Sequence, residues 1–157
     1  MADCANAAPT LRPASRSDLP AIVRLLSDDV LGGGRERAQG AVDPRYEAAF
    51  EAIQSDPNQA FLVAERDGQM VGCLQLSFIP GLSRLGAWRG QIESVRVKQD
   101  CRGRGVGSEM IRLAIAECRE RGCKLVQLTS DKQRTDAIRF YERLGFEASH
   151  EGMKLPL

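Results

Sequence analysis

Residues 97–122 read VKQDCRGRGVGSEMIRLAIAECRERG and join a glycine loop, residues 102–108, to a helix pattern. The apolar residues after the loop have the spacing of one helix face: Met110, Ile111, Ala114, Ile115 and Cys118. Backbone N–H groups at a helix start have no intrahelical partner, and the aligned peptide dipoles favour negative charge there. Glycine allows close approach of the backbone, and Arg102 and Arg104 can contact phosphate oxygens. We therefore predict an anion site, above all for phosphate, at the start of this helix.

The segments around the loop predict a mixed α/β fold with one β-sheet. A strand over 86–97 precedes the loop, and KLVQLTS, residues 124–130, is a further buried strand. Two apolar runs joined at Asp67-Gly68 predict an antiparallel hairpin. Helices are expected after the caps Ser17 and Asp43, and over 134–144.

The remaining segments complete the order β-α-α-β-β-β-α-β-α-β. A short strand is expected in TLRPA, residues 10–14, and one or two final strands in FEASHEGMKLPL, residues 146–157. The helical connections from Val97 onward imply at least one parallel strand pair. Gly-rich residues 31–42, LGGGRERAQGAV, predict a mobile loop.

Period-two alternation assigns faces to the strand that enters the loop. It places Glu93, Val95 and Val97 on one face of the sheet and Ile92, Ser94 and Arg96 on the other.

Length and composition predict one domain over residues 1–157, with 1–9 as a flexible tail. Lys and Arg number 22 and Asp and Glu 21, so the net charge of +1 gives no support for nucleic-acid binding. Five cysteines without a CxxC pair and the single His150 predict no metal site and fit a reducing cytoplasm. No stretch approaches the ~20 apolar residues of a membrane span.

Other glycine motifs fit the loop less well. A P-loop needs a Lys after its last glycine, and Ser108 follows Gly107 instead. The dinucleotide fingerprint needs its third glycine one place later and a position near the first strand. An RGG-type nucleic-acid segment would carry interleaved aromatic residues, which the loop lacks.

Two motifs together resemble one family. The pattern Arg102-x-x-Gly105-x-Gly107 is similar to the acyl-CoA pyrophosphate loop of the GNAT superfamily of N-acetyltransferases, and AIRFYERLGF, residues 137–146, resembles a second signature of that family. The resemblance covers roughly residues 11 to 154 and implies the GNAT-like acyl-CoA N-acyltransferase fold, a single twisted mixed β-sheet flanked by helices.

The resemblance also implies a binding site for acetyl-CoA. The pyrophosphate would lie on the loop, and the pantetheine on the backbone of the preceding strand. The implied residues are Val95, Arg96, Val97, Arg102, Gly103, Arg104, Gly105, Val106, Gly107 and Ser108. Many members carry Asn where this chain has Arg134, which either reaches the cofactor or is an exposed first-turn residue.

The reaction implied by the resemblance is acetyl transfer to an amine by direct attack. Tyr141, at the position of the family's tyrosine, would protonate the leaving thiolate, or else is a packed helix aromatic. Glu93 is the candidate base, with a pKa raised by desolvation in an apolar strand, or else is a solvent-exposed or salt-bridged carboxylate. A small-molecule amine is favoured over a protein amine as acceptor. A homodimer through the last strands is a further expectation, and a non-catalytic CoA-binding regulatory module is the alternative function.

Overall fold

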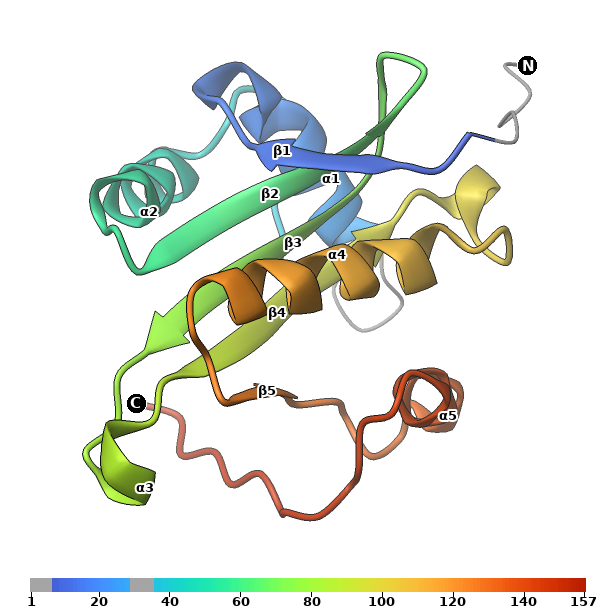
Figure 1. Ribbon diagram of the computed structural model, residues 1–157. Coiled ribbons are helices and arrows are strands. Elements are labelled where there is room, and N and C mark those ends of the chain that lie inside the picture. Colours follow the sequence, from blue (N-terminus) through green and yellow to red (C-terminus); the bar gives the residue numbers. More distant parts are fainter. Residues whose placement is uncertain (1–6, 29–35) are drawn as a thin grey trace.

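The computed structural model describes residues 7–28 and 36–157, arranged around one β-sheet (Figure 1). The elements are β1 (Thr10–Pro13), η1 (Arg16–Asp18), α1 (Leu19–Ser27), α2 (Pro44–Ser55), β2 (Gln59–Arg66), β3 (Gln69–Ile79), α3 (Ser83–Gly86), β4 (Arg89–Val97), η2 (Gln99–Cys101), α4 (Val106–Glu120), β5 (Leu125–Leu128) and α5 (Thr135–Arg143). Most of the expected tail, residues 1–9, and the first part of the expected loop at 31–42 lie outside the described residues.

The sheet has the order β1-β2-β3-β4-β5. Neighbouring strands are antiparallel except β4 and β5, which are parallel, so the expected parallel pair is confirmed. The hairpin between β2 and β3 is also confirmed. Its two turn residues, Asp67 and Gly68, have φ of 51° and 73°, as a two-residue turn with the right twist requires.

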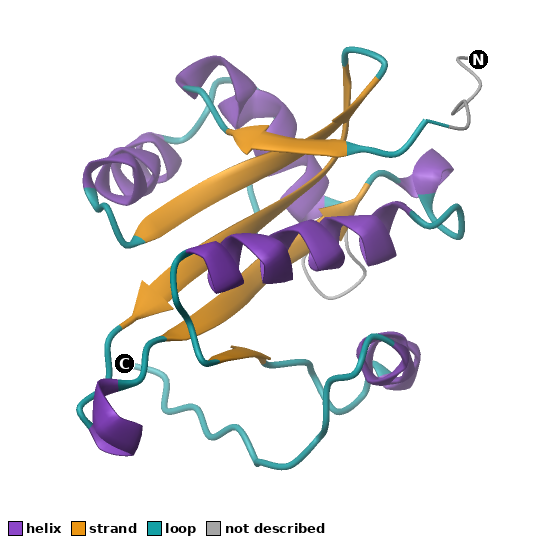
Figure 2. Ribbon diagram, in the orientation of Figure 1, coloured by secondary structure: helices purple, strands orange, loops and turns teal. Residues whose placement is uncertain are grey.

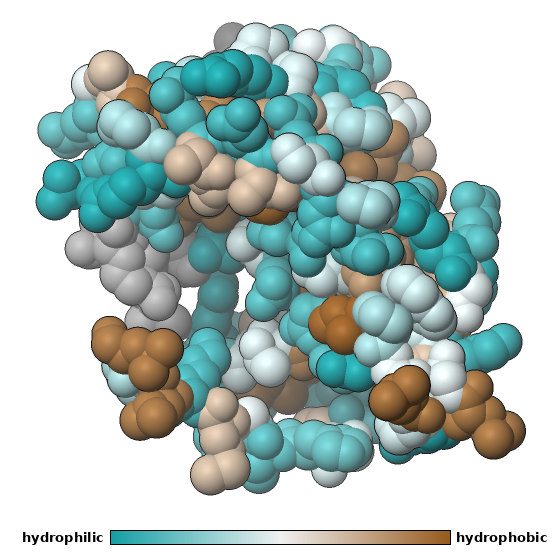
Figure 3. Space-filling model, turned by 90° about the vertical axis from the view of Figure 1, so that its left-hand side faces the viewer, coloured by the Kyte–Doolittle hydropathy of each residue, from teal (hydrophilic) through white to brown (hydrophobic). Residues whose placement is uncertain are grey.

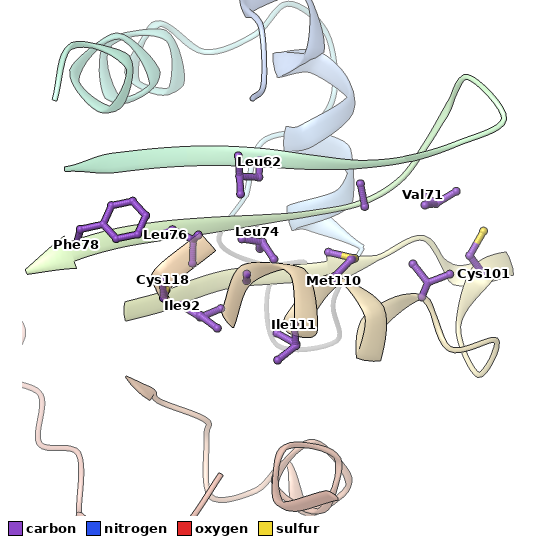
Figure 4. Packing of buried hydrophobic residues seen from close by; sticks show 13 residues of the cluster. Leu62, Val71, Leu74, Leu76, Phe78, Ile92, Cys101, Met110, Ile111 and Cys118 are labelled. Atoms are coloured by element: carbon purple, nitrogen blue, oxygen red, sulfur yellow. The ribbon is translucent and has the colours of Figure 1, made fainter. Parts of the chain in front are cut away.

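Helix α4 covers one face of the sheet and α1 the other, which Figure 1 shows as α4 in front of the strands and α1 behind them. Leu74, Leu76 and Ile92 belong to the same buried cluster as Met110 and Cys118 of α4, and Figure 4 shows this cluster between the strands and α4. All five side chains are at most 2 % exposed, so burial of this face is a main source of stability.

The opposite face is covered by α1 and α2. Val63 of β2 and Cys73 of β3 pack with Ile22 and Val23 of α1 and with Phe50 of α2. The expected N-cap of α2 is confirmed, because the Asp43 carboxylate accepts a hydrogen bond from the Arg45 backbone N–H at 3.0 Å.

The first helical stretch begins earlier than the expected cap at Ser17. Ser15 is the N-cap of η1, and its backbone N–H donates to the Asp18 carboxylate at 2.7 Å. Arg12 of β1 donates two hydrogen bonds to the same carboxylate, at 2.8 and 3.0 Å, and thereby holds the pKa of Asp18 well below its usual range. The prediction failed because a contact with β1, which local sequence does not reveal, fixes this end.

The expected strands after α5 are absent from the described chain. Residues 147–157 have no regular secondary structure, and Figure 2 draws this whole segment as loop. Met153, Leu155 and Leu157 are 94 %, 83 % and 118 % exposed. The alternating pattern is therefore present in an extended segment, but the segment joins no ladder and its apolar side chains have no surface to pack on.

No helix in the described ranges combines the length and apolarity that a membrane crossing requires.

The contact between α4 and the sheet depends on Gly72 of β3. A Cβ at this position would lie 2.7 Å from the Arg96 backbone oxygen and 2.7 Å from the Met110 sulfur. We expect Gly72→Ala to lower the free energy of unfolding by about 1–3 kcal/mol, measured by urea denaturation, because a backbone atom cannot give way cheaply. Gly152→Ala is the control, since its Cβ would meet only Thr129 at 3.7 Å, and it should change stability by less than about 0.5 kcal/mol. Equal stability of the two variants would contradict this account of the close contact.

Candidate functional site

A β-bulge in β4 shapes the site. Gln75 and Cys73 of β3 pair with Glu93 and Arg96, so the single residue Leu74 lies opposite the two residues Ser94 and Val95. Ser94 has φ of 54°, a left-handed conformation that is uncommon for a residue other than glycine. Such bulges interrupt the ladder and redirect side chains.

The bulge corrects the expected faces. Glu93 and Arg96 lie on the same face as their partners Gln75 and Cys73, whereas Val97 pairs with Gly72 on the face covered by α4. The expectation that Glu93 and Val97 share a face is wrong, because the extra residue in β4 reverses the alternation. Val95 packs against the cluster on the α4 side.

Beyond Ile92, β4 has no strand beside it on the β5 side within the described chain. The parallel pairing of these strands covers Arg89 to Ile92 and stops at Leu128. Residues 93–97 therefore form an edge next to the end of β5. Such an edge can hydrogen-bond an extended ligand through its backbone.

The glycine loop leads from this edge into α4. Gly103 and Gly105 have φ of 73° and 79°, and Gly105 is the N-cap of the helix. The first helical bond runs from Glu109 N to Gly105 O at 3.1 Å, so the N–H groups of Val106, Gly107 and Ser108 have no intrahelical acceptor. Arg104 is exposed beside them. This arrangement fits an anionic group such as a pyrophosphate.

Two residues anchor the loop to the core. Val106 is 1 % exposed and belongs to the α4-side cluster. A Cβ on Gly107 would lie 3.4 Å from Phe140 of α5 and 3.5 Å from Val97 of β4. Gly107 therefore lets three elements meet at one point, in addition to leaving room for a ligand.

Arg102 braces the loop against α1. Its guanidinium donates to Val97 O at 3.0 Å and to Asp28 O at 3.2 Å, and it lies 3.8 Å from the Asp28 carboxylate. Its backbone N–H donates to Gln99 O at 3.3 Å. The side chain that we expected to contact phosphate is thus engaged with protein, and contact with phosphate stays a prediction for it.

Tyr141 lies half-buried on α5, between two other rings. Its ring centroid is 5.0 Å from that of Phe140 and 5.8 Å from that of Phe146, both edge to face. Desolvation raises the pKa of the Tyr141 phenol above its ordinary value, while the positive charges of Arg134 and Arg96 partly oppose the shift. These two charges place the hydroxyl within electrostatic reach of the β4 bulge and of the N-cap of α5.

Comparison with known proteins identifies the family of this chain. The model of the acetyltransferase (GNAT) family matches residues 21–146 of the chain, which include β4, the loop, α4 and Tyr141. The chain belongs to the GNAT acetyltransferase family. The expected family is thus confirmed, together with its fold of a mixed sheet flanked by helices.

Named relatives agree with this assignment. The chain is 34 % identical over 105 residues to the aminoalkylphosphonate N-acetyltransferase of Salmonella typhimurium, covering 67 % of this chain and 68 % of that protein. It is 37 % identical over 90 residues to the glucosamine 6-phosphate N-acetyltransferase of Trypanosoma brucei brucei, over 57 % of this chain and 59 % of the relative.

Among solved structures, a Bacillus halodurans C-125 protein named a transcriptional regulator is 48 % identical, with a TM-score of 0.92 over 95 % of this chain and 99 % of that one. An acetyltransferase of Trypanosoma brucei is 28 % identical, with a TM-score of 0.76 over 95 % and 99 %. Because its fold is that of the GNAT family and its relatives are named N-acetyltransferases, this GNAT protein is an N-acetyltransferase enzyme. The family uses acetyl-CoA as acetyl donor to an amine, and a purely regulatory role is not favoured.

Not every expected site residue of this GNAT domain lies where the sequence suggested. Glu93 is exposed, so the apolar surroundings expected around its carboxylate are absent. Arg134 is exposed at the N-cap of α5. No group of three or more metal-binding side chains occurs within residues 7–28 and 36–157.

Two contacts at the site could not be predicted from the sequence. The charge of Arg96 acts on Tyr141, although we had assigned only the Arg96 backbone to the site. Asp28, at the end of α1, holds Arg102 from a position 74 residues away in the chain. No local signal marks either contact, because both depend on the packing of α1 and α5 around β4.

The bulge should tolerate only residues that accept a positive φ at position 94. We expect Ser94→Gly to keep kcat/KM for acetyl-CoA within about twofold, because glycine adopts this conformation without strain. Ser94→Val should lower the free energy of unfolding by about 1–2 kcal/mol and reduce kcat/KM, because its branched Cβ opposes a left-handed backbone. Urea denaturation and steady-state kinetics on both variants test this. Wild-type behaviour of the valine variant would show that the bulge is not constrained by residue 94.

Proposed function

We propose that this enzyme transfers an acetyl group from acetyl-CoA to the primary amine of a small molecule, by direct attack in a ternary complex, within a single N-acetyltransferase domain. One observation supports the proposal above others: the open edge of β4, the N-terminus of α4 and the half-buried Tyr141 meet around Gly107 and the bulge. The named activities of the Salmonella and Trypanosoma relatives, on an aminoalkylphosphonate and on glucosamine 6-phosphate, support a small acceptor over a protein amine.

The donor would bind through groups already placed for it. The N–H groups of Val106, Gly107 and Ser108 would hold the pyrophosphate, with Arg104 adding charge. The backbone of residues 95–97 would align the pantetheine along β4, and Arg134, whose charge lowers the pKa of Tyr141, would contact the same arm. When bound, acetyl-CoA supplies an acetyl group activated as a thioester.

Two side chains would handle the protons. In the transfer, the amine nitrogen forms a bond to the acetyl carbon, and the electron pair of the broken carbon–sulfur bond goes to sulfur. Glu93, exposed before the bulge, would take the proton that the amine loses, directly or through a water. Tyr141 would give its proton to the sulfur, and its raised pKa keeps that proton in place at neutral pH.

Replacement of Tyr141 tests the mechanism. We expect Tyr141→Phe to lower kcat by about 10²-fold or more while the Kd for acetyl-CoA stays within about threefold, because a proton donor acts only in the chemical step. The protonated form of Tyr141 is the active one and its pKa lies above the ordinary 10.0, so the midpoint of any decline in wild-type kcat caused by this group should lie above pH 10. Tyr46→Phe is the matched control, since the Tyr46 hydroxyl donates to Glu36 and its ring packs with the cluster on the α1 and α2 side, not with Phe140 and Phe146. Unchanged turnover of Tyr141→Phe would remove Tyr141 from the mechanism.

We also propose that the protein forms a homodimer through residues 147–157. The support is the exposure of Met153, Leu155 and Leu157 together with the edge position of β5, which has a strand on one side only. Leu82 and Leu85 at α3 are fully exposed as well, and Figure 3 shows separate groups of brown side chains on both sides of the lower part of the molecule. Exposed apolar groups of this kind mark protein interfaces, and an edge strand can pair with another chain.

The oligomeric state tests this surface. We expect a dimer by light scattering coupled to size exclusion, and a monomer for Leu155→Asp, because a charge in the interface would lose its hydration. Lys124→Asp, an exposed change beside β5, is the control. A monomeric wild type at micromolar concentration would contradict the proposal.

A further inference from the structure

A row of polar side chains crosses the sheet on the face opposite α4. Gln59 of β2 pairs with Ser77 of β3, Ser77 pairs with Gln91 of β4, and Gln91 pairs with Gln127 of β5. We call these four residues the polar row. They occupy one register position on four successive strands and therefore point to the same side of the sheet.

Hydrogen bonds tie the polar row together. The Ser77 hydroxyl donates to Gln59 Oε1 at 2.7 Å, and Gln127 Nε2 donates to Gln91 Oε1 at 2.7 Å. Gln75, two residues before Ser77 on β3 and on the same face, donates to the same Gln59 oxygen at 3.1 Å. These contacts hold the carboxamides in defined orientations, as a binding surface requires.

The polar row lies on a face of the sheet that is otherwise largely buried and apolar. On this same face, Val63 and Cys73 are fully buried beneath α1 and α2, only a few residues along the strands. Ser77 itself is only 7 % exposed, while Gln91 is partly exposed and Gln127 is exposed. Exposure therefore decreases along the row from Gln127 of β5 to Ser77 of β3.

The row leads to the proposed base. Glu93 follows Gln91 on the same strand and the same face, opposite Gln75. Two residues along a strand span about 7 Å, so a molecule the size of one ring can contact Gln91 and present its amine to Glu93. Glu93 is also the first residue of the open edge of β4, and the bulge begins at the next residue, Ser94.

The chemistry of the row selects its ligand. A carboxamide offers two donors and one acceptor oxygen, and a hydroxyl offers one of each kind, so the row can both donate and accept. None of its four side chains is charged. Alcohol hydroxyls, which also donate and accept, complement such a surface, whereas a phosphate or carboxylate would call for arginine or lysine.

We propose that the polar row is the floor of the acceptor site and selects an amine that carries several hydroxyl groups, such as an amino sugar. This inference rests on the proposed acetyl transfer. It adds the acceptor class and assigns Gln91 and Gln127 as specificity-determining residues that contact the acceptor.

The test compares two six-membered ring amines, glucosamine and cyclohexylamine, which differ in their hydroxyl groups. We expect Gln91→Leu and Gln127→Leu each to lower kcat/KM for glucosamine about tenfold and to leave that for cyclohexylamine within about twofold. Because each variant is compared with the wild type for the same amine, the different basicity of the two amines cancels. Gln69→Leu, at the hairpin end of β3, is the matched control and should change neither value.

Several outcomes would overturn the proposal. An equal loss for both amines would give the row a structural role only. A wild-type preference for 2-aminoethylphosphonate that Gln91→Leu does not reduce would place acceptor recognition on Arg89 and Arg96, at the two ends of this stretch of β4, instead.

If the wild type binds acetyl-CoA but acetylates no amine, the proposed function fails independently of this inference. Saturation-transfer NMR of glucosamine with the CoA-bound protein then decides about the row by itself. If glucosamine binds the wild type and Gln91→Leu abolishes that binding, the polar row is supported as part of the acceptor site. If glucosamine does not bind the wild type, the proposal is overturned.

Discussion

The two-against-one pairing of Ser94 and Val95 with Leu74 is the constraint on which the site depends. With Ile92 beneath α4, a regular β4 would place Glu93 and Val97 together on the opposite face and leave the core below α4 without Val97. Because of the bulge, Val97 packs in the core below α4, while Glu93 and Arg96 lie on the opposite face of the sheet. The left-handed Ser94 carries the backbone cost of this arrangement, as is common at functional sites.

The part of β4 that follows Ile92 also connects the other elements of the site. Beyond Ile92 the parallel ladder with β5 ends, and α5 follows with its aromatic side chains next to the gap. Gly107 has no side chain, so Phe140 can approach both α4 and Val97, and Tyr141 is held one residue further on. The start of α4, which we propose to bind phosphate, and a phenol of raised pKa are thereby packed against one strand. Arg102 extends the connection to α1, because it donates to Val97 O and to Asp28 O.

The activities named for two relatives and the polar row both support the proposed class of acceptor. The aminoalkylphosphonate and glucosamine 6-phosphate named for two relatives are both small amines with an anionic group, and the second is also a hydroxylated ring. In this chain the face beside Glu93 carries carboxamides and a hydroxyl, with Arg89 and Arg96 at the two ends of that stretch of β4. Hydroxyl recognition would thus take place along the strands, and any anionic substituent would have to reach one of the two ends.

The sequence by itself determined the elements whose signals are local: the Asp67-Gly68 hairpin, the Asp43 cap, the glycine loop opening α4, and the motif that carries Tyr141. Each rests on a few adjacent residues whose backbone or capping preferences are strong. Tertiary structure decided the bulge at Ser94, the exposure of Glu93, the capture of Arg102 by Asp28 and the absence of strands after α5. These features depend on what lies opposite a residue, and period-two alternation cannot register an inserted residue or a missing partner strand.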